Sequence, residues 1–436
     1  MKKLSKRQKK IIWSLSFWTI AGILFLAASA LLVLWASGYK YNFLAHKFQK
    51  TGIIYLTTDP KNVDIYLDGK LIKQKTPAKI SYLLPGRYKI EIKKKNYHNW
   101  VQEVEVESNK VKRFDNIILF YSQPKSFEIS KNVQSFFLSP DKNKLIYQSD
   151  SFYLYDLKNF SPKKIAENNF SFISWSANSN KILFKNQNSL YYYNLSNSTL
   201  SPIQSNELLN YQKVLWQPTD DNNLFALVNN NLYLLNLDTG PKLLANGISD
   251  FNVGSNNLYY ITNTDQKIIL QKANLDFTNP YEIAELSDAQ SQIILKEPYV
   301  FIKDSKNNLF QISQNAQEKI NGNIKLFTWS ENSSFFGLMK NIKFLYNTNL
   351  DDIYSYDPGT KNNKFIYRTV KPIQKIEWYS DLNYLIFSAD SEIKIIGIDG
   401  KNEILIAKGN DFKIIEASKI IILDPENHLK IFQIRD

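Results

Sequence analysis

A unit of roughly 40 residues recurs through residues 121–436, and it constrains the fold more than any other feature of the sequence. Each unit opens with an apolar segment ending near Trp-Ser or Ser-Pro-Asp, followed by a polar turn and two further apolar segments. The copies at 136–157, 172–195 and 214–237 are the clearest, and those near Phe251 and Ile293 are weaker. Equivalent positions in successive units are 37, 41, 37, 42, 34, 49 and 38 residues apart, namely Leu138, Trp175, Trp216, Val253, Leu295, Trp329, Trp378 and Glu416.

A period near 40 residues with about four short strands per repeat is typical of β-propeller blades. Eight blades are favoured, and seven would follow if the weak copy near Ile293 belonged to a neighbour. The last unit, 412–434, offers only three strands, whereas 126–130 is a strand with no place in the first unit. We predict that 126–130 becomes the outer strand of the last blade and closes the ring, because closure removes exposed sheet edges. The Ser139-Pro140-Asp141 and Trp-Ser units resemble TolB-like and WD-repeat-like propellers, which implies a fold but no particular function.

The N-terminal segment predicts a single membrane anchor. Residues 11–36 are uncharged and mostly apolar, longer than the roughly 20 residues that cross a bilayer. Residues 1–10 form a tail with six basic and no acidic residues, so we expect this tail in the cytoplasm and the chain after about Gly38 outside. The alternative is a cleaved signal peptide, since Ala28-Ser29-Ala30 has the form of a cleavage site. The apolar run continues past Ala30, which favours an uncleaved anchor in the cell membrane.

After a connector at 37–51, residues 52–120 read as about six short strands. Val63, Ile65 and Leu67 alternate with polar or aromatic residues, and Asp68-Gly69 is typical of a tight hairpin turn. This pattern predicts a small β-sandwich with one solvated face. The soluble part is therefore expected to be all-β.

The order of turn motifs in residues 52–120 resembles the PEGA domain, a small β-fold of bacterial and archaeal surface proteins. The matching elements are Asp68-Gly69 between strands, Thr76-Pro77, and Pro85-Gly86-Arg87-Tyr88. The turn that names the family reads Pro60-Lys61-Asn62-Val63 here, and its usual Gly-Tyr pair is Asn96-Tyr97. The resemblance implies a non-catalytic domain outside the cytoplasm, whose motif residues shape loops.

The net charge of +13 is concentrated near the anchor. Residues 1–120 hold 22 Lys/Arg and 8 Asp/Glu, a net of +14, whereas residues 121–436 hold 32 and 33, a net of −1. A neutral propeller argues against nucleic acid as a partner. The chain contains no cysteine, so thiolate metal sites, disulfides and thiol catalysis are excluded.

No catalytic, cofactor-binding or metal-binding residue is predicted. The three histidines, His46, His98 and His428, fall in separate modules, and the sequence has no G-x-S-x-G or phosphate-loop motif. The acidic pairs at 220–221 and 351–352 lack calcium-loop spacing, and 93–95 is expected to be a solvated run of lysines rather than a lipid or wall-polymer contact. The Trp and Tyr residues of the repeats are expected to pack blades rather than to stack on sugars.

These observations predict a non-catalytic cell-envelope protein. It would be held by one helix and use its propeller to bind or scaffold a protein or glycan, without a cofactor. The alternative is a propeller hydrolase or lyase acting on an extracellular polymer, which would need a convergent group of acidic residues, His or Tyr at the channel mouth.

Overall fold

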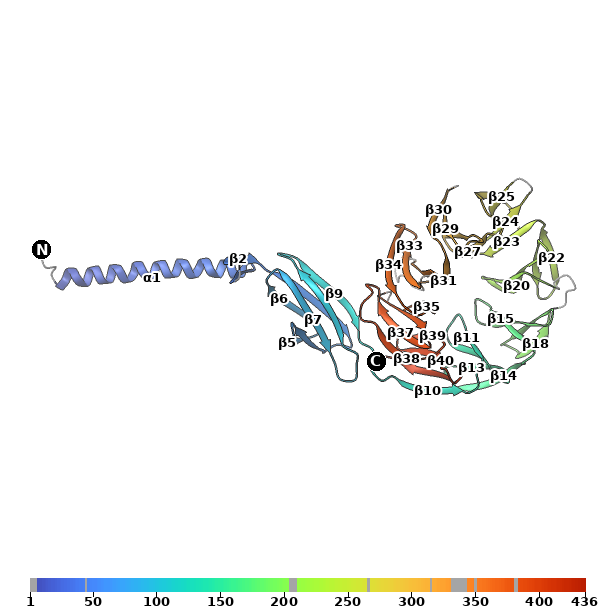
Figure 1. Ribbon diagram of the computed structural model, residues 1–436, viewed down its shortest axis with the longest axis horizontal. Helices are drawn as coiled ribbons and strands as arrows, with labels where there is room; N and C mark the ends of the chain where they lie inside the picture. Colours follow the sequence, from blue (N-terminus) through green and yellow to red (C-terminus); the bar gives the residue numbers. More distant parts are fainter. Residues whose placement is uncertain are drawn as a thin grey trace. The chain divides into compact units, whose positions relative to one another are not determined.

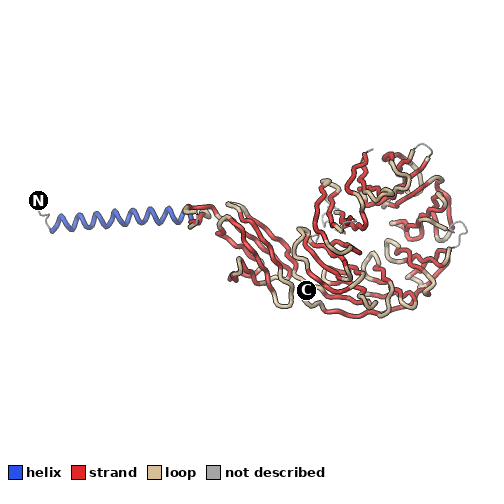
Figure 2. The backbone as a smooth tube through the Cα atoms, in the orientation of Figure 1, coloured by secondary structure: helices blue, strands red, loops and turns tan. Residues whose placement is uncertain are grey.

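The computed structural model describes residues 6–43, 45–203, 210–264, 267–313, 316–330, 343–348, 351–379 and 383–436. The chain divides into two compact units. The first contains Met1–Gln123 together with Arg435–Asp436, and the second is Pro124–Ile434. Beyond the N-terminal helix, the described chain is strand and loop (Figure 2), so the expectation of an all-β soluble part is confirmed.

The helix α1 runs from Lys6 to Ala36, and its segment Ile12–Ala36 is long and apolar enough to cross a membrane. At 1.5 Å per residue its 25 residues span about 37 Å, more than the roughly 30 Å hydrocarbon core of a bilayer. None of its most apolar stretch is buried inside the protein. Large side chains such as Trp18 and Phe25 are exposed, as expected for a surface that lipid covers.

The connector folds into a short hairpin of β1 (Tyr39–Asn42) and β2 (Lys47–Lys50), which composition alone did not indicate. Two sheets follow. One has the order β6-β3-β9, made of Ala78–Leu83, Gly52–Asp59 and Val111–Ile118, and β3 and β9 are parallel. The other has the order β5-β4-β7-β8, made of Lys70–Lys75, Asp64–Leu67, Gly86–Lys93 and Trp100–Val106.

The two sheets enclose one apolar core, so the predicted β-sandwich is confirmed. Side chains of β3 alternate between buried and half-buried, and Ile54 and Leu56 are fully buried with Ile65 and Ile90 of the other sheet. Asp68 and Gly69 have φ values of 47° and 77°, the left-handed conformations that a two-residue turn between β4 and β5 requires.

Residues Arg435 and Asp436 belong to this first unit. The Asp436 carboxylate accepts hydrogen bonds from the hydroxyl of Tyr97, at 2.6 Å, and from that of Tyr121. These two bonds hold the pKa of Asp436 below its usual value, although burial opposes them. Arg435 Nη1 lies 2.9 Å from Asp59 Oδ2.

The second unit contains eight four-stranded antiparallel sheets among its described residues, arranged around a centre (Figure 1). In chain order the first four are β11–β14 (Ser135–Leu138, Lys144–Gln148, Ser151–Asp156, Ser161–Glu167), β15–β18 (Ser171–Trp175, Lys181–Asn186, Ser189–Asn194, Thr199–Pro202), β19–β22 (Lys213–Gln217, Asp220–Val228, Asn231–Asn236, Gly240–Ala245) and β23–β26 (Ile248–Val253, Asn257–Asn263, Ile268–Asn274, Tyr281–Leu286). The next are β27–β30 (Gln292–Lys296, Tyr299–Lys303, Leu309–Ser313, Ala316–Asn321), β31–β34 (Ile324–Trp329, Phe344–Thr348, Asp352–Asp357, Asn362–Arg368) and β35–β38 (Ile373–Trp378, Tyr384–Ala389, Glu392–Gly397, Ile404–Lys408). The eighth joins β39 (Asp411–Glu416), β40 (Lys419–Leu423) and β41 (Leu429–Gln433) with β10 (Lys125–Ser130).

Each aligned repeat position lies on the first strand of one sheet, from Leu138 on β11 to Glu416 on β39. Successive sheets are joined by shared apolar clusters, for example Phe152 of the first with Phe184 of the second, and Leu183 of the second with Trp216 of the third. Trp175, Trp216 and Trp378 are buried in such clusters, which confirms their predicted packing role. This is the arrangement of β-propeller blades.

The predicted ring closure is confirmed. β10 pairs antiparallel with β41 from Lys125↔Gln433 to Ser130↔Leu429 and forms the outer strand of the last sheet. The first and last blades also share an apolar cluster in which Val133 and Phe136 pack with Ile421 and Leu429. Backbone pairing and side-chain packing therefore both join the two ends of the propeller.

Ion pairs connect the first strands of neighbouring blades. Lys375 on β35 lies 2.6 Å from Asp411 on β39, and Lys413 on β39 lies 2.5 Å from Glu377 on β35. The Glu377 side chain is 14% exposed and that of Lys413 is 40% exposed, so only the carboxylate side of this pair is shielded from water.

Candidate functional site: an apolar cavity between the first and last blades

The histidines lie in different surroundings. His46 is exposed in the hairpin turn, and His98 is half-buried beside Phe120 in the first unit. His428 Nδ1 lies 3.6 Å from Glu128 and 3.7 Å from Asp424 in the last blade. Within the described ranges, no group of three or more His, Cys, Asp or Glu side chains has an arrangement suited to a metal ion.

The carboxylates near His428 have structural partners. Asp424 accepts hydrogen bonds from the His428 backbone N–H at 2.8 Å and from Lys430 Nζ at 2.6 Å. Burial opposes ionisation of Asp424, but Lys430 and the backbone N–H outweigh burial and hold the pKa of this carboxyl below its usual value. The cluster caps the turn between β40 and β41.

The two acidic pairs also stabilise turns. Asp220 accepts hydrogen bonds from the Asn222 backbone at 2.9 Å, and Asp221 accepts one from Asn178 at 2.8 Å. Asp351 accepts a hydrogen bond from the Ile373 backbone at 3.0 Å. Arg368 donates two hydrogen bonds to Asp352 and holds the pKa of that carboxyl below its usual value.

The lysine run at 93–95 has local partners at two of its three positions. Lys93 Nζ lies 2.5 Å from Glu91, and Lys94 Nζ lies 5.0 Å from the ring centre of Tyr97. Lys95 is exposed. These contacts fit the predicted solvated run.

The site that the structure adds is an apolar cavity of about 490 Å³ between the first and last blades. Four short segments line it: the start of β10, the turn after β13, the turn between β39 and β40, and the end of β41. The lining residues are Lys125, Ser126, Phe127, Leu157, Phe160, Ile415, Glu416, Lys419, Ile431 and Gln433. Its volume lies within the roughly 300–1,000 Å³ that ligand sites commonly occupy.

Two phenylalanines at the cavity have side chains that are unusually exposed to solvent. Phe127 is 53% exposed and Phe160 is 58% exposed, and their ring centres lie 5.9 Å apart in an edge-to-face arrangement. Phe127 is on the outer strand β10, opposite Ile431. An exposed, paired set of large apolar rings over an apolar cavity is a typical interaction surface.

Phe160 holds its position through a strained turn. Asp156 organises this turn by accepting hydrogen bonds from the backbone N–H groups of Lys158, at 2.7 Å, and Asn159, at 3.1 Å. Phe160 itself has φ of 54°, a left-handed conformation that is uncommon for a bulky residue. The equivalent turns of the next two blades place Ser198, with φ of 59°, and Gly240, with φ of 89°, at this position.

Those equivalent positions are the signal that sequence reasoning missed. Asp156-Leu157-Lys158-Asn159-Phe160 aligns with Asn194-Leu195-Ser196-Asn197-Ser198 and with Asn236-Leu237-Asp238-Thr239-Gly240. A phenylalanine where the next two copies have small residues marks a departure from the pattern of these three copies. The repeat alone does not explain this residue.

The residues that line the cavity are suited to binding a ligand rather than to catalysis. Its ionisable groups are Lys125, Glu416 and Lys419, and Glu416 Oε1 is already paired with Lys419 Nζ at 3.2 Å. None of the lining residues is a histidine, and its one hydroxyl side chain, that of Ser126, has no histidine beside it in the lining. Apolar atoms make up most of the lining surface.

The comparison with known proteins gives a different kind of match for each of the two units. The model of the PEGA domain family matches residues 51–117. The resemblance drawn from the turn motifs is thereby confirmed, and the PEGA domain is the sandwich that follows the hairpin. The comparison with curated proteins gave no match.

Solved structures resemble the second unit. A crystal structure of the eukaryotic initiation factor has a TM-score of 0.51 at 13% identity and covers 72% of this chain and 93% of that chain. The WD40 domain of SCAP from fission yeast has a TM-score of 0.48 at 11% identity, with coverage of 71% and 98%. An oligogalacturonate lyase in complex with manganese has a TM-score of 0.42 at 11% identity, with coverage of 72% and 98%. At these identities the likeness concerns the fold alone, a β-propeller.

Proposed function

We propose that this protein is a membrane-anchored binding protein whose propeller engages a protein partner through the cavity between its first and last blades. The single observation that supports this most is Phe160, an exposed aromatic ring kept in a left-handed turn. A conformation of this kind costs on the order of 1–3 kcal/mol and persists where it serves another purpose. Phe160 covers little of the protein's own core, so folding does not account for it.

The lining chemistry favours a protein over a glycan as the occupant. Sugars require many hydrogen-bonding groups beside an aromatic ring, whereas Ser126 and Gln433 are the uncharged polar side chains of this cavity. Leu157, Ile415 and Ile431 are suited instead to apolar side chains of a partner. We therefore expect an apolar anchor segment from another protein to bind there.

The anchoring part of the proposal rests on α1. Its basic N-terminal side motivates an orientation in which the tail is cytoplasmic and both β units are outside. Protease added to spheroplasts should then digest the chain beyond residue 50 while α1 stays in the membrane after carbonate extraction. Full protection of the β units would contradict this orientation.

Photo-crosslinking tests the binding surface directly. A photoreactive phenylalanine analogue at position 160, in intact cells, should capture a discrete protein partner. The same analogue at Phe365, which is 49% exposed on β34 of another blade, is the matched control. Phe127→Ser with Phe160→Ser should weaken binding of the captured protein at least tenfold, as expected for an aromatic anchor. Equal capture at both positions, or full binding by the double variant, would refute the cavity as the site.

A stability comparison separates a binding role from a structural one. Phe160→Gly relieves the left-handed strain and should leave the melting temperature unchanged or higher while binding is lost. Phe277 also has a left-handed φ, of 68°, but its ring lies 4.9 Å from that of the buried Tyr260 and packs on a core cluster. Phe277→Gly should therefore destabilise the protein. If Phe160→Gly destabilised it equally, Phe160 would be a packing residue.

A further inference from the structure

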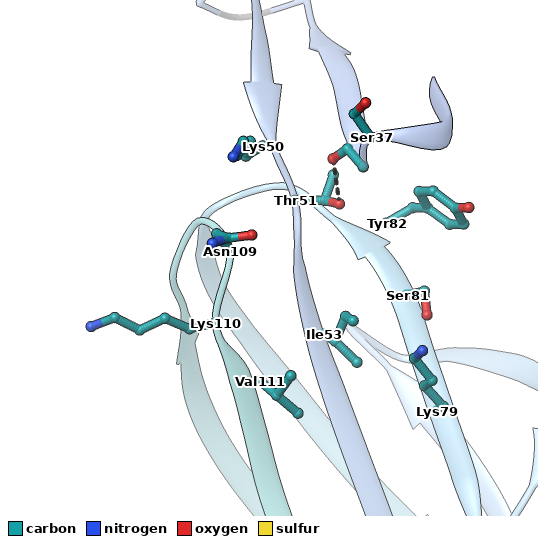
Figure 3. A pocket seen from close by; sticks show the side chains of 11 residues that line it. Ser37, Lys50, Thr51, Ile53, Lys79, Ser81, Tyr82, Asn109, Lys110 and Val111 are labelled. Atoms are coloured by element: carbon teal, nitrogen blue, oxygen red, sulfur yellow. Dashed lines mark hydrogen bonds between the residues drawn. The ribbon is translucent and has the colours of Figure 1, made fainter. Parts of the chain in front are cut away.

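A second, polar cavity lies where the membrane segment meets the PEGA domain. It has a volume of about 300 Å³ and is lined by Ser37, Gly38, Lys50, Thr51, Ile53, Lys79, Ser81, Tyr82, Asn109, Lys110 and Val111 (Figure 3). Three lysines contribute to this lining, from β2, β6 and the turn before β9, and no acidic residue does. The cavity is therefore electropositive.

Two of the three lysines are available for a ligand. Lys110 Nζ is paired with Glu107 at 2.5 Å. In the part of the chain that the structure describes, neither Lys50 nor Lys79 has an ion-pair partner, and Lys50 Nζ lies 5.7 Å from the ring centre of Tyr39. Ser37, Ser81 and Asn109 add hydroxyl and amide groups to the same cavity. Ammonium groups with neutral donors beside them are suited to a phosphate.

The backbone around the cavity is fixed. Thr51 donates two hydrogen bonds to the Gly38 carbonyl, from its backbone N–H at 2.9 Å and from its hydroxyl at 2.8 Å. The Asn109 backbone N–H donates to the Thr51 carbonyl at 3.0 Å. These bonds tie the residues after the helix to the PEGA domain, as Figure 3 shows for Thr51.

The depth of the cavity relative to the bilayer follows from the sequence. The apolar span ends at Ala36, and Ser37 and Gly38 of the cavity are the next two residues. At about 1.5 Å per residue, they lie within a few Å of the hydrocarbon boundary. The headgroup layer of a bilayer is roughly 5–7 Å thick on each side, so the cavity lies at headgroup level.

Aromatic rings support the same depth. Tyr82, 41% exposed with φ of 62°, stacks on Trp35 with ring centres 5.7 Å apart and planes at 4°. On the adjoining hairpin, Phe43 and Phe48 are exposed and pack edge-on against Tyr41. Aromatic rings of this kind favour the membrane–water interface.

We infer that this cavity binds the phosphate of an anionic glycerophospholipid in the leaflet that faces the PEGA domain. Lys50 and Lys79 contact the phosphate, and the acyl chains follow α1 into the bilayer beside Trp35. The inference rests on the membrane anchoring of the proposed function but not on the propeller's partner. A bound lipid would fix the PEGA domain to the membrane surface.

Native mass spectrometry of the full-length protein in detergent tests this assignment. The probes are dihexanoyl phosphatidylglycerol, dihexanoyl phosphatidylcholine and inorganic phosphate. We expect phosphatidylglycerol to bind most tightly and inorganic phosphate only at much higher concentration, because phosphate lacks acyl chains. Equal affinity for inorganic phosphate and phosphatidylglycerol would overturn the lipid assignment, and equal affinity for phosphatidylcholine would overturn the requirement for an anionic lipid.

Charge-matched variants locate the site. Lys50→Gln and Lys79→Gln should each weaken phosphatidylglycerol binding about fivefold, and the double variant that combines them should weaken it further. Lys70→Gln with Lys73→Gln, two exposed lysines of β5 outside the cavity, changes the net charge equally and should leave binding intact. Equal binding by both double variants would exclude the cavity. All variants should resist carbonate extraction, and release of the unsubstituted protein would instead indicate failure of the anchor itself.

Discussion

The strand that closes the propeller, β10, should contribute more to the stability of the protein than the burial of its side chains suggests. The first four of the six side chains of β10 are exposed, whereas β14, the outer strand of the first blade, buries Ile165 and Ala166. Judged by burial alone, β14 should contribute more to the stability of its blade than β10 does. Ring closure predicts instead that β10 contributes more, because β10 pairs with β41 of the last blade and leads directly into the first blade.

The comparison is made by replacing every residue of either strand with glycine. Glycine in a strand costs about 0.5–1 kcal/mol per residue, so weakening the five paired positions of β10 amounts to roughly 3–4 kcal/mol. The last blade would then be held to the first mainly by side-chain packing, such as Val133 against Leu429. Opening of β39–β41 should become easier by about the same 3–4 kcal/mol, or roughly two to three orders of magnitude in population.

Hydrogen exchange of the full-length protein measures this opening blade by blade. In the β10 variant, amides of β39–β41 should exchange a few hundred times faster, while those of β24 and β25 stay protected. In the β14 variant, faster exchange should be limited to the first blade. Equal protection of β39–β41 in the two variants would show that the pairing of β10 does not hold the ring closed.

Three further outcomes are expected. Glu377→Gln removes the carboxylate 2.5 Å from Lys413 and should lower the free energy of unfolding by about 1–2 kcal/mol in urea titrations, between the values for exposed and buried pairs. Burial raises the pKa of Tyr356 to about 12, so its contribution to stability is present below its unfolded pKa of about 10 and is lost between about pH 10 and pH 12. Tyr356→Phe should flatten that part of an alkaline unfolding curve, and an unchanged slope would contradict the assignment. Terminal peptide sequencing of the protein from membranes should find an N-terminus before residue 10, and one at Leu31 would show signal cleavage instead.

The propeller could be predicted because the sequence pattern of each blade lies within one short stretch of the chain. Each blade repeats the same short pattern, so Trp175 and Trp378 could be placed on first strands from spacing alone. Ring closure followed from counting, since the last unit lacked a strand and 126–130 had no partner. Even the weak copies around Val253 and Leu295 form blades, because their second strands keep buried apolar residues such as Ile261 and Phe301.

The cavities were not predictable because they depend on contacts between distant segments. Lys50 and Lys79 come from β2 and β6, and the composition of the connector did not indicate the hairpin that places Lys50 beside the PEGA domain. The apolar cavity likewise requires β10 to lie next to the turn at Phe160, about 33 residues further along the chain than Phe127. A repeat pattern describes what the blades share, whereas the apolar cavity lies where the first blade differs and the polar cavity lies outside the repeats.

Conformation and exposure together distinguish aromatic residues that bind from those that pack. Phe160, Phe277 and Tyr82 all have positive φ values, so backbone strain alone does not identify a site. The ring of Phe277 packs on a buried cluster, and that packing offsets the strain of its turn. The rings of Phe160 and Tyr82 instead remain exposed beside a cavity. Because strain without compensating burial lowers stability, these two residues are the ones whose conformation calls for a ligand or a membrane to explain it.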